Sequence, residues 1–168
     1  MFPSTFTLTA SAAEKAMDAA CQEAAANGWS VTVAISDAGG VPILVKRSEA
    51  FPASYEIAVG KAKTAARERK YCNVIHNDTP FISYLLLCML FTVFQKPTSS
   101  LESAANVSDG SSRTALLSAP YILMGGGIPI FANEQCIGSV GVSGVKPNED
   151  EQVAMAAVKA LSSVISKL

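Results

Sequence analysis

Charge and histidine are both scarce in this sequence of 168 residues. Charged residues make up 16% of the chain, and 13 basic residues stand against 14 acidic ones, which gives a formal net charge of −1. Without a basic excess the chain is not suited to neutralising phosphates, so we expect no nucleic acid partner. His76 is the one histidine, which excludes a Ser-His-Asp triad or a multi-histidine metal site in the rest of the chain.

Paired cysteines and an export signal are missing as well. Cys21, Cys72, Cys88 and Cys136 are widely spaced and form no CxxC pair. This spacing argues against a zinc site and favours reduced, mostly buried thiols. Residues 1–10 carry neither a positive charge nor an apolar run, so they are not typical of a secretory signal. We therefore expect a cytoplasmic protein.

Hydrophobic residues are abundant, at 49%, and the length suits a single domain over residues 1–168. A capping box at 11–14 and a stop at Asn27-Gly28 predict a first helix over about 11–27. Pro52 suits the first turn of a second helix that reaches about Arg67. In that helix the apolar face is Tyr55, Ala58, Val59 and Ala62, with Glu56, Lys61 and Lys63 elsewhere. A second capping box at 148–151 opens a last helix over about 149–167.

The alternation of apolar and polar residues predicts the strands. Residues 30–46 have the pattern of a β-hairpin with its turn at 37–40. Three more strands are predicted at 121–124, 128–131 and 136–143. The order α-β-β-α-β-β-β-α, in which hairpins dominate, predicts an α+β fold. Its sheet is mainly antiparallel and five-stranded, with flanking helices.

Residues 68–93 differ in composition from the rest of the chain. The run from 79 to 94 is nearly free of charge and rich in leucine and phenylalanine, whereas the remainder favours alanine and glycine. It is shorter than the roughly 18–20 apolar residues that a transmembrane helix needs. Three interpretations stay open: a buried helix, a membrane-surface or partner-binding segment, and a segment that is extraneous to the fold.

Three motifs together make the sequence similar to the GlcG/HbpS family. They are GKAKTAA at 60–66, MGGGIPI at 124–130, and IGSVGVSG at 137–144 with its sequel NEDE at 148–151. The family is the haem-degrading-domain group that also occurs at the C-terminus of PduO-type cobalamin adenosyltransferases. The resemblance covers nearly the whole chain except residues 68–93. It implies a GlcG/HbpS-like fold, a homo-oligomer and an anionic small-molecule ligand, with haem or another tetrapyrrole as the candidate.

The resemblance also sharpens the third interpretation of residues 68–93. In the family the KAxTA helix runs directly into a phenylalanine and a Pro-Thr-Ser-like turn, and residues 94–100 (FQKPTSS) match that sequel. Joining Arg67 to Phe94 would restore the family pattern without a gap. The hypothesis is therefore that 68–93 is an atypical hydrophobic insertion, such as the translation of a retained intron.

Five residues are the candidate ligand-binding set: Lys61, Thr64, Gly125, Gly126 and Gly127. The three glycines could bring backbone amides close to a ligand carboxylate or propionate, or they could form a tight bend or β-bulge between strands. Lys61 could pair with an anionic group or lie on a solvated helix face. Thr64, three residues on, could bond the same ligand or its own helix carbonyl.

Haem is the one cofactor that the resemblance suggests, and no metal site is predicted. His76 has the chemistry of a haem ligand but lies within 68–93 and matches no family position. The leading function is the binding, with or without degradation, of an anionic ligand such as haem. Two alternatives stay open: a cofactor-independent enzyme acting on a small organic acid or catabolic intermediate, and an accessory oligomer without catalysis. Any catalysis would rest on Lys, Arg, Glu, Asp or Tyr side chains.

Overall fold

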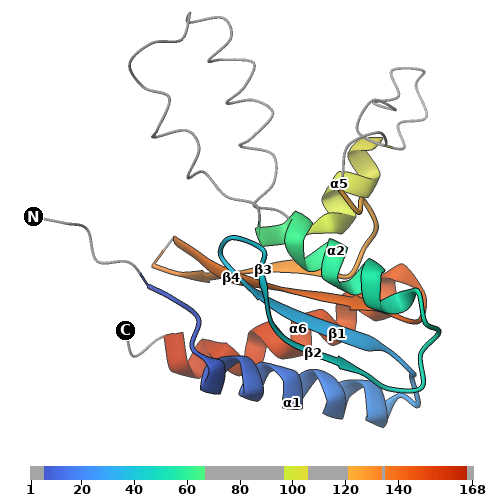
Figure 1. The fold of residues 1–168 in the computed structure, drawn as a ribbon, viewed down its shortest axis with the longest axis horizontal. Coiled ribbons are helices and arrows are strands. Elements are labelled where there is room, and N and C mark those ends of the chain that lie inside the picture. Colours follow the sequence, from blue (N-terminus) through green and yellow to red (C-terminus); the bar gives the residue numbers. More distant parts are fainter. Residues whose placement is uncertain (1–5, 67–96, 106–120, 134, 166–168) are drawn as a thin grey trace, which may run out of the picture.

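The chain forms a four-stranded antiparallel sheet with helices on both faces (Figure 1). The computed structural model describes residues 6–66, 97–105, 121–133 and 135–165. The strands are β1 (Thr32–Asp37), β2 (Pro42–Arg47), β3 (Gly127–Ala132) and β4 (Gln135–Ser143), in the order β2-β1-β4-β3. The helices are α1 (Ala10–Ala26), α2 (Ser54–Ala66), α5 (Thr98–Ala105) and α6 (Pro147–Ile165). The predicted α+β class with an antiparallel sheet is confirmed.

The pairing of β1 with β4 joins the two halves of the sequence. Val33 lies opposite Val142, and Ile35 lies opposite Val140. Because directly opposed residues of an antiparallel pair point to the same face, these four side chains form one apolar patch at the centre of the sheet. The alternation of residues within 30–46 and 136–143 therefore determines which face of β1 and β4 is apolar, as well as predicting the strands themselves.

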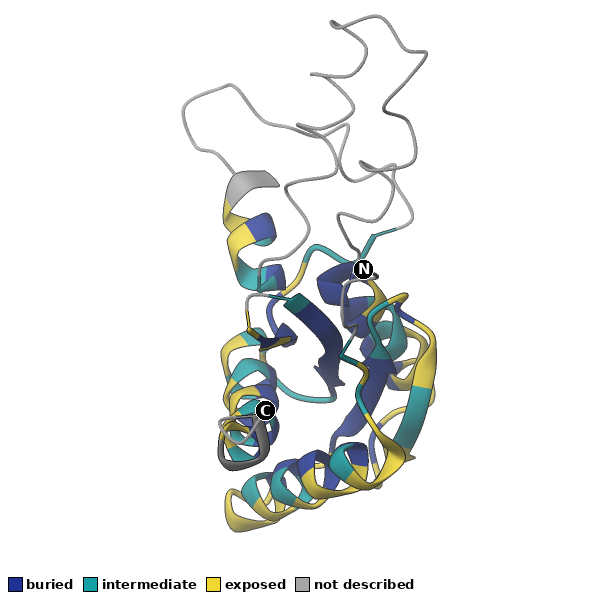
Figure 2. Cartoon of the chain, turned by 90° about the vertical axis from the view of Figure 1, so that its left-hand side faces the viewer, coloured by how far each residue is buried: buried dark blue, intermediate teal, exposed yellow. Residues whose placement is uncertain are grey.

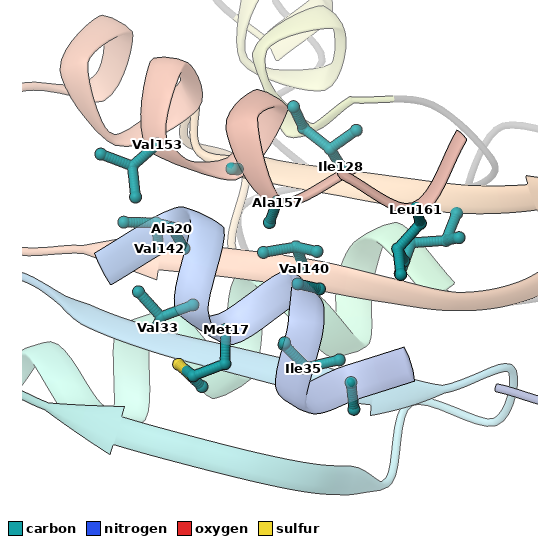
Figure 3. Packing of buried hydrophobic residues seen from close by; sticks show 14 of the residues in the cluster. Met17, Ala20, Val33, Ile35, Ile128, Val140, Val142, Val153, Ala157 and Leu161 are labelled. Carbon is teal, nitrogen blue, oxygen red and sulfur yellow. The ribbon is translucent and has the colours of Figure 1, made fainter. Parts of the chain in front are cut away.

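The apolar face of the sheet is covered by α1 and α6, which pack against each other. Figure 3 shows Met17 and Ala20 of α1 and Ala157 and Leu161 of α6 meeting the valine and isoleucine side chains of the strands. All of these side chains are at most 5% exposed. Burying one valine, leucine or isoleucine contributes about 1.5–3 kcal/mol, so this layer is the main source of stability.

The opposite face of the sheet is built from small residues and is covered by α2. Thr32, Ala34 and Ser36 of β1 lie there beside Ser139 and Gly141 of β4. A Cβ atom at Gly141 would lie 2.1 Å from the Ala58 carbonyl oxygen and 2.4 Å from the Ala62 nitrogen. The α2 backbone therefore rests directly on β4. Strands β1, β3 and β4 are largely buried between α2 and the layer formed by α1 and α6, as the dark blue strands in Figure 2 show, whereas β2 at the edge of the sheet is half-buried or exposed.

Hydroxyl groups connect α2 to the strands beneath it. Ser139 Oγ donates to the Ala62 carbonyl at 2.6 Å, so the Ser36 hydroxyl, 2.6 Å from Ser139, is the donor in that second bond. The same reasoning makes Thr32 the donor to Ser54, whose own hydroxyl donates to a backbone carbonyl. No buried side-chain nitrogen or oxygen of the described residues lacks a partner, so this polar layer carries no desolvation penalty from an unmade bond.

One predicted strand is wrong. Residues 121–124 do not join the sheet, which has four strands instead of five. Side chains take up the backbone groups that a strand would have used: the Ile122 N–H donates to Thr64 Oγ1, and the Met124 carbonyl accepts from Thr98 Oγ1. The short apolar run leads into the glycines as a loop pinned by side chains.

The helix ends also differ in detail from the prediction. The N-cap of α1 is Thr9, whose hydroxyl accepts from the Ala12 N–H at 3.2 Å, so the capping box expected at Ser11 is not formed. In α6 the helix begins at Pro147, and Glu149 reaches back to the Lys146 N–H, two residues before the expected box. The stop at Asn27-Gly28 is confirmed, with Gly28 at φ 68°.

Several predictions fall on residues that the structure does not describe. They concern the insertion at 68–93, His76, the thiols of Cys72 and Cys88, and the last two residues of the predicted C-terminal helix. These remain predictions. Among the described helices, none combines enough length with enough apolar character to cross a lipid bilayer.

Candidate functional site

Lys61 is a fully buried cation beneath the loop of three glycines. Its side chain comes from the sheet-facing side of α2 and is 0% exposed. The ammonium nitrogen donates to Asp150 Oδ2 at 2.8 Å and to the Val142 carbonyl at 2.9 Å. Lys61 thus joins α2 to β4 and to the first turn of α6.

The expected division of α2 into faces is therefore wrong at two positions. Lys61 was placed off the apolar face and is buried, while Tyr55 was placed on that face and is 49% exposed. Lys61 can be buried because the Val142 carbonyl and the Asp150 carboxylate accept hydrogen bonds from its ammonium group. Lys63, two residues further on, is exposed.

Asp150 holds the other half of the ion pair. Its side chain is 2% exposed, and Oδ1 accepts from the Val145 N–H at 3.2 Å. Burial raises the pKa of Asp150 above its ordinary value of 3.8, and the hydrogen bond and charge of Lys61 oppose that effect. The carboxyl group is therefore held in a place where its charge depends on the lysine beside it.

The glycine loop, residues 125–127, passes directly over this pair. Gly126 has φ 110°, a conformation that favours glycine. A Cβ atom there would come within 2.7 Å of the Asp150 Cβ and 3.1 Å of the Lys61 ammonium nitrogen. A Cβ at Gly127 would lie 2.6 Å from the methyl group of Thr98. The loop needs glycine both for its backbone angles and for its closeness to the buried pair.

Two threonine hydroxyls hold the flanks of the loop. Thr64 Oγ1 donates to the Gly60 carbonyl at 2.7 Å and accepts from the Ile122 N–H at 3.0 Å. Thr98 Oγ1 donates to the Met124 carbonyl at 2.6 Å and accepts from the Gly127 N–H at 2.8 Å. Thr64 therefore bonds its own helix carbonyl, as one of the two interpretations had it, and it also holds the segment before the glycines; that it binds a ligand stays a prediction.

A carboxylate already binds the glycine loop, and it belongs to the protein itself. Glu102 of α5 accepts from the Gly125 N–H through Oε2 at 2.8 Å. Helix α5 lies beside α2 (Figure 1) and is anchored by Leu101, which is 2% exposed. The loop amide can therefore recognise a carboxylate, which is the chemistry that the three glycines suggested.

The structure brings together all five residues that the sequence singled out. Lys61 and Thr64 lie one turn apart on α2, Gly126 and Gly127 lie against Lys61, and Thr64 bonds Ile122 in the segment that leads into Gly125. Sequence reasoning missed three partners: Asp150, Thr98 and Glu102. A signal existed for the first two, because Asp150 lies in the NEDE sequel and Thr98 in the Pro-Thr-Ser turn of the family resemblance. Nothing in the sequence pointed to Glu102.

A separate pocket of about 370 Å³ opens at the β1–β2 turn. Asp37 at its edge accepts from the Gly39 and Val41 N–H groups, both at 2.9 Å, so its Oδ1 shapes the turn. The remaining wall is largely apolar and comes from the N-terminal segment, the turn and the β3–β4 hairpin: Phe6, Thr7, Leu8, Ala38, Gly39, Ile43, Gln135 and Ile137. The size is at the lower end of small-molecule sites.

Within the part of the chain that the structure describes, no three His, Cys, Asp or Glu side chains gather closely enough to hold a metal ion. The charged chemistry of the loop region is thus a buried lysine–aspartate pair and one glutamate on a backbone amide. Such a site can bind and orient an anion through amides, and it can keep a buried cation close to that anion.

Comparison with known proteins gives consistent results. A family model described as "Haem degrading protein HbpS-like" matches residues 8–159. The protein GlcG of Escherichia coli K12 is 31% identical over 124 residues, which cover 73% of this chain and 70% of GlcG. The crystal structure of Klebsiella pneumoniae protein ORFY superposes with a TM-score of 0.71 at 28% identity, covering 100% of this chain and 98% of that one. A double mutant of HbpS from Streptomyces reticuli gives 0.70 at 27% identity, covering 96% and 91%.

Proposed function

The chain belongs to the HbpS-like family, and on that premise we propose that it binds a small anionic ligand of the haem or tetrapyrrole class. The observation that carries the proposal is the family match over residues 8–159, a span that includes every residue of the glycine loop and its supports. The geometry adds that the loop binds a carboxylate oxygen through the Gly125 amide. Haem offers two such carboxylates.

We place the carboxylate of the ligand at the glycine loop. Backbone amides supply the hydrogen bonds, and Lys61 supplies a positive charge from below, close to Gly126. Because Lys61 is fully buried, its proposed role is to support the loop and to make the electrostatic potential at the loop more positive, with Asp150 as its partner. Thr64 holds the segment that leads into the loop in position by accepting a hydrogen bond from the Ile122 amide. The five predicted residues thereby act as one binding unit.

The proposal rests on the carboxylates of the ligand and not on an iron ligand. The one histidine, His76, lies outside the described residues, and no axial ligand is assigned. Degradation of the bound tetrapyrrole is the finer activity that the family's description suggests. It is tested on the same sample, as a loss of the haem absorption bands with time after a reductant and oxygen are supplied.

Titration with haem tests the binding. A saturable shift of the Soret band is expected for the wild-type protein. In Lys61→Met the affinity should fall, because the loop loses its buried cation. The matched control is Lys63→Met, an exposed lysine on the same helix, which should bind as the wild type does. Thermal melting of both variants checks that they are folded at the titration temperature. An unchanged affinity in Lys61→Met would remove this lysine from the site.

A small organic acid is the second candidate ligand, with an enzyme acting on it as the second candidate function. The Glu102–Gly125 contact favours it as much as it favours haem, because it demonstrates recognition of a simple carboxylate. Binding of propionate without any Soret change on addition of haem would support this alternative. Binding of neither ligand would leave the third alternative, an accessory oligomer.

The proposal includes a homo-oligomeric, cytoplasmic protein, as the sequence predicted. Several large apolar side chains are exposed, among them Val41 at 61% and Phe51 and Tyr55 at 49% each. Strands β2 and β3 form the two edges of the sheet. Contacts between copies would shield both features. Light scattering coupled to gel filtration measures the oligomeric state, and a purely monomeric protein at micromolar concentration would contradict this part.

A further inference from the structure

We propose that the Gly125 amide is a carboxylate-binding position whose resident occupant, Glu102, gives way to a carboxylate of the ligand. The inference rests on the proposed function, because it names the ligand group that the loop takes. It assigns to Glu102 the role of an internal competitor. Affinity for the ligand would then depend on how readily α5 releases this side chain.

The hydrogen bonds of the loop single out Glu102. The Ile122 and Gly127 amides donate to threonine hydroxyls, and the Gly126 carbonyl accepts from the Val142 amide. All of those partners are neutral. Gly125 alone among these loop contacts donates to an ionisable side chain, at 2.8 Å. A carboxylate on a backbone amide is also what a bound ligand carboxylate would provide, so the internal contact reproduces the proposed one.

Glu102 is placed so that it can leave without unfolding its helix. Thr98 and Leu101 fasten the first turn of α5 to the body, Thr98 through the loop and Leu101 by burial. Ser99 adds a bond to Glu151 of α6 at 2.9 Å. Glu102 lies one turn further on and is partly exposed. No cation among the described residues pairs with Glu102. The hydrogen bond from the Gly125 N–H is therefore what keeps this side chain on the loop.

The exchange is close to balanced, which makes the competition measurable. A ligand carboxylate replaces the Gly125 contact by one of the same kind, while Glu102 regains water. The internal carboxylate has the advantage of being tethered, which acts as a high local concentration. Removing the competitor should therefore strengthen ligand binding on the order of tenfold, which corresponds to about 1.4 kcal/mol.

The first test compares wild type, Glu102→Gln and Glu102→Ala, with Glu56→Gln as the control. Glu56 is an exposed glutamate on α2, so this control removes the same charge away from the loop. Haem is titrated by its Soret band, in parallel with haem dimethyl ester, which lacks free carboxylates. We expect Glu102→Ala to bind haem on the order of tenfold more tightly, Glu102→Gln, whose amide oxygen still accepts from the Gly125 N–H, to gain less, and both to bind the ester unchanged. Equal haem affinity in all four proteins would overturn the inference while leaving the proposed function in place.

The second test does not depend on haem. Propionate is added to Glu102→Ala and to wild type, and the ¹H–¹⁵N signal of the Gly125 amide is followed. A saturable shift at lower propionate concentration in the variant supports the inference, even if haem fails to bind and the proposed function falls. A Gly125 signal that does not respond to propionate in either protein rejects the carboxylate position itself.

Discussion

The buried Lys61–Asp150 pair gives the sharpest prediction about stability. Replacing Lys61 by methionine keeps an unbranched side chain that is one atom shorter and removes the charge. Asp150 then stays buried with only the Val145 amide as a partner, because its other contact was the lysine 2.8 Å away. Removing one partner of a buried ion pair typically destabilises a protein by about 3–5 kcal/mol. A natural domain has about 5–15 kcal/mol in total, so the loss would be large.

The destabilisation should grow with pH. Burial already raises the pKa of Asp150 above its ordinary value, and without Lys61 nothing but the Val145 amide opposes that effect. A carboxyl group whose folded pKa is raised contributes stability below its unfolded pKa, about 3.8, and loses it as the pH rises through the folded value. As the pH falls toward the ordinary pKa of 3.8, Asp150 takes up a proton and the variant should approach wild type, and as the pH rises the deficit should grow.

Urea unfolding from pH 4 to 8 measures this effect, supported by thermal melts. For a chain of this size about 4 kcal/mol corresponds to a fall in Tm of roughly 10–15 °C. The double variant Lys61→Met/Asp150→Asn should recover most of the loss and its pH dependence, since it buries no lone charge. Lys63→Met is the exposed control and should unfold as wild type. A deficit in Lys61→Met that is below about 1 kcal/mol, or that does not change with pH, would refute the reasoning.

Three further predictions follow from other parts of the structure. Gly141→Ala should lower the free energy of unfolding in urea by about 2–3 kcal/mol, because its Cβ would meet the α2 backbone at 2.1 Å. The control Gly28→Ala meets nothing within 4 Å and should lower it by only about 1 kcal/mol, because alanine is disfavoured at its φ of 68°. Thr98→Val removes the hydroxyl that accepts from the Gly127 N–H and should lower the free energy of opening the loop by about 1–3 kcal/mol. Hydrogen exchange of the Gly127 amide should then be faster, whereas Ser103→Ala, on the exposed side of α5, should leave that rate unchanged. A variant lacking 68–93, with Arg67 joined to Phe94, should fold and keep the Tm of the full chain within a few degrees. Aggregation or loss of the cooperative unfolding transition would contradict the insertion hypothesis. Sequencing the spliced transcript would show whether these codons come from a retained intron.

Some of the site was accessible from sequence because local patterns carry it. The glycines at 125–127 and the KAxTA helix were recognisable as motifs, and the structure places them together. The fate of Lys61 was not accessible. A lysine between apolar positions of a helix is ordinarily solvated, and whether it is buried depends on what faces it. Here the Val142 carbonyl of β4 and the carboxylate of Asp150 face it, and those lie about 80–90 residues away in the chain.

Local patterns in the sequence did not predict α5, but they did predict α1, α2 and α6, the four strands that form the sheet and the apolar face of β1. Those follow from periodicity and from turn residues, which act over a few positions along the chain. The sequence could not decide that 121–124 would be a loop, because this short apolar run is the same whether strand neighbours or side chains take its backbone hydrogen bonds.

The partners of Lys61 and of the Gly125 amide depend on the tertiary structure. The fold places the Lys61 ammonium beneath the glycine loop, pairs it with Asp150, and brings the Glu102 carboxylate to the Gly125 amide. The physical reason is that hydrogen bonds and ion pairs depend on distances of about 3 Å between groups far apart in sequence. Those distances are fixed when α2 settles onto the small-residue face of the sheet and α6 packs against the other.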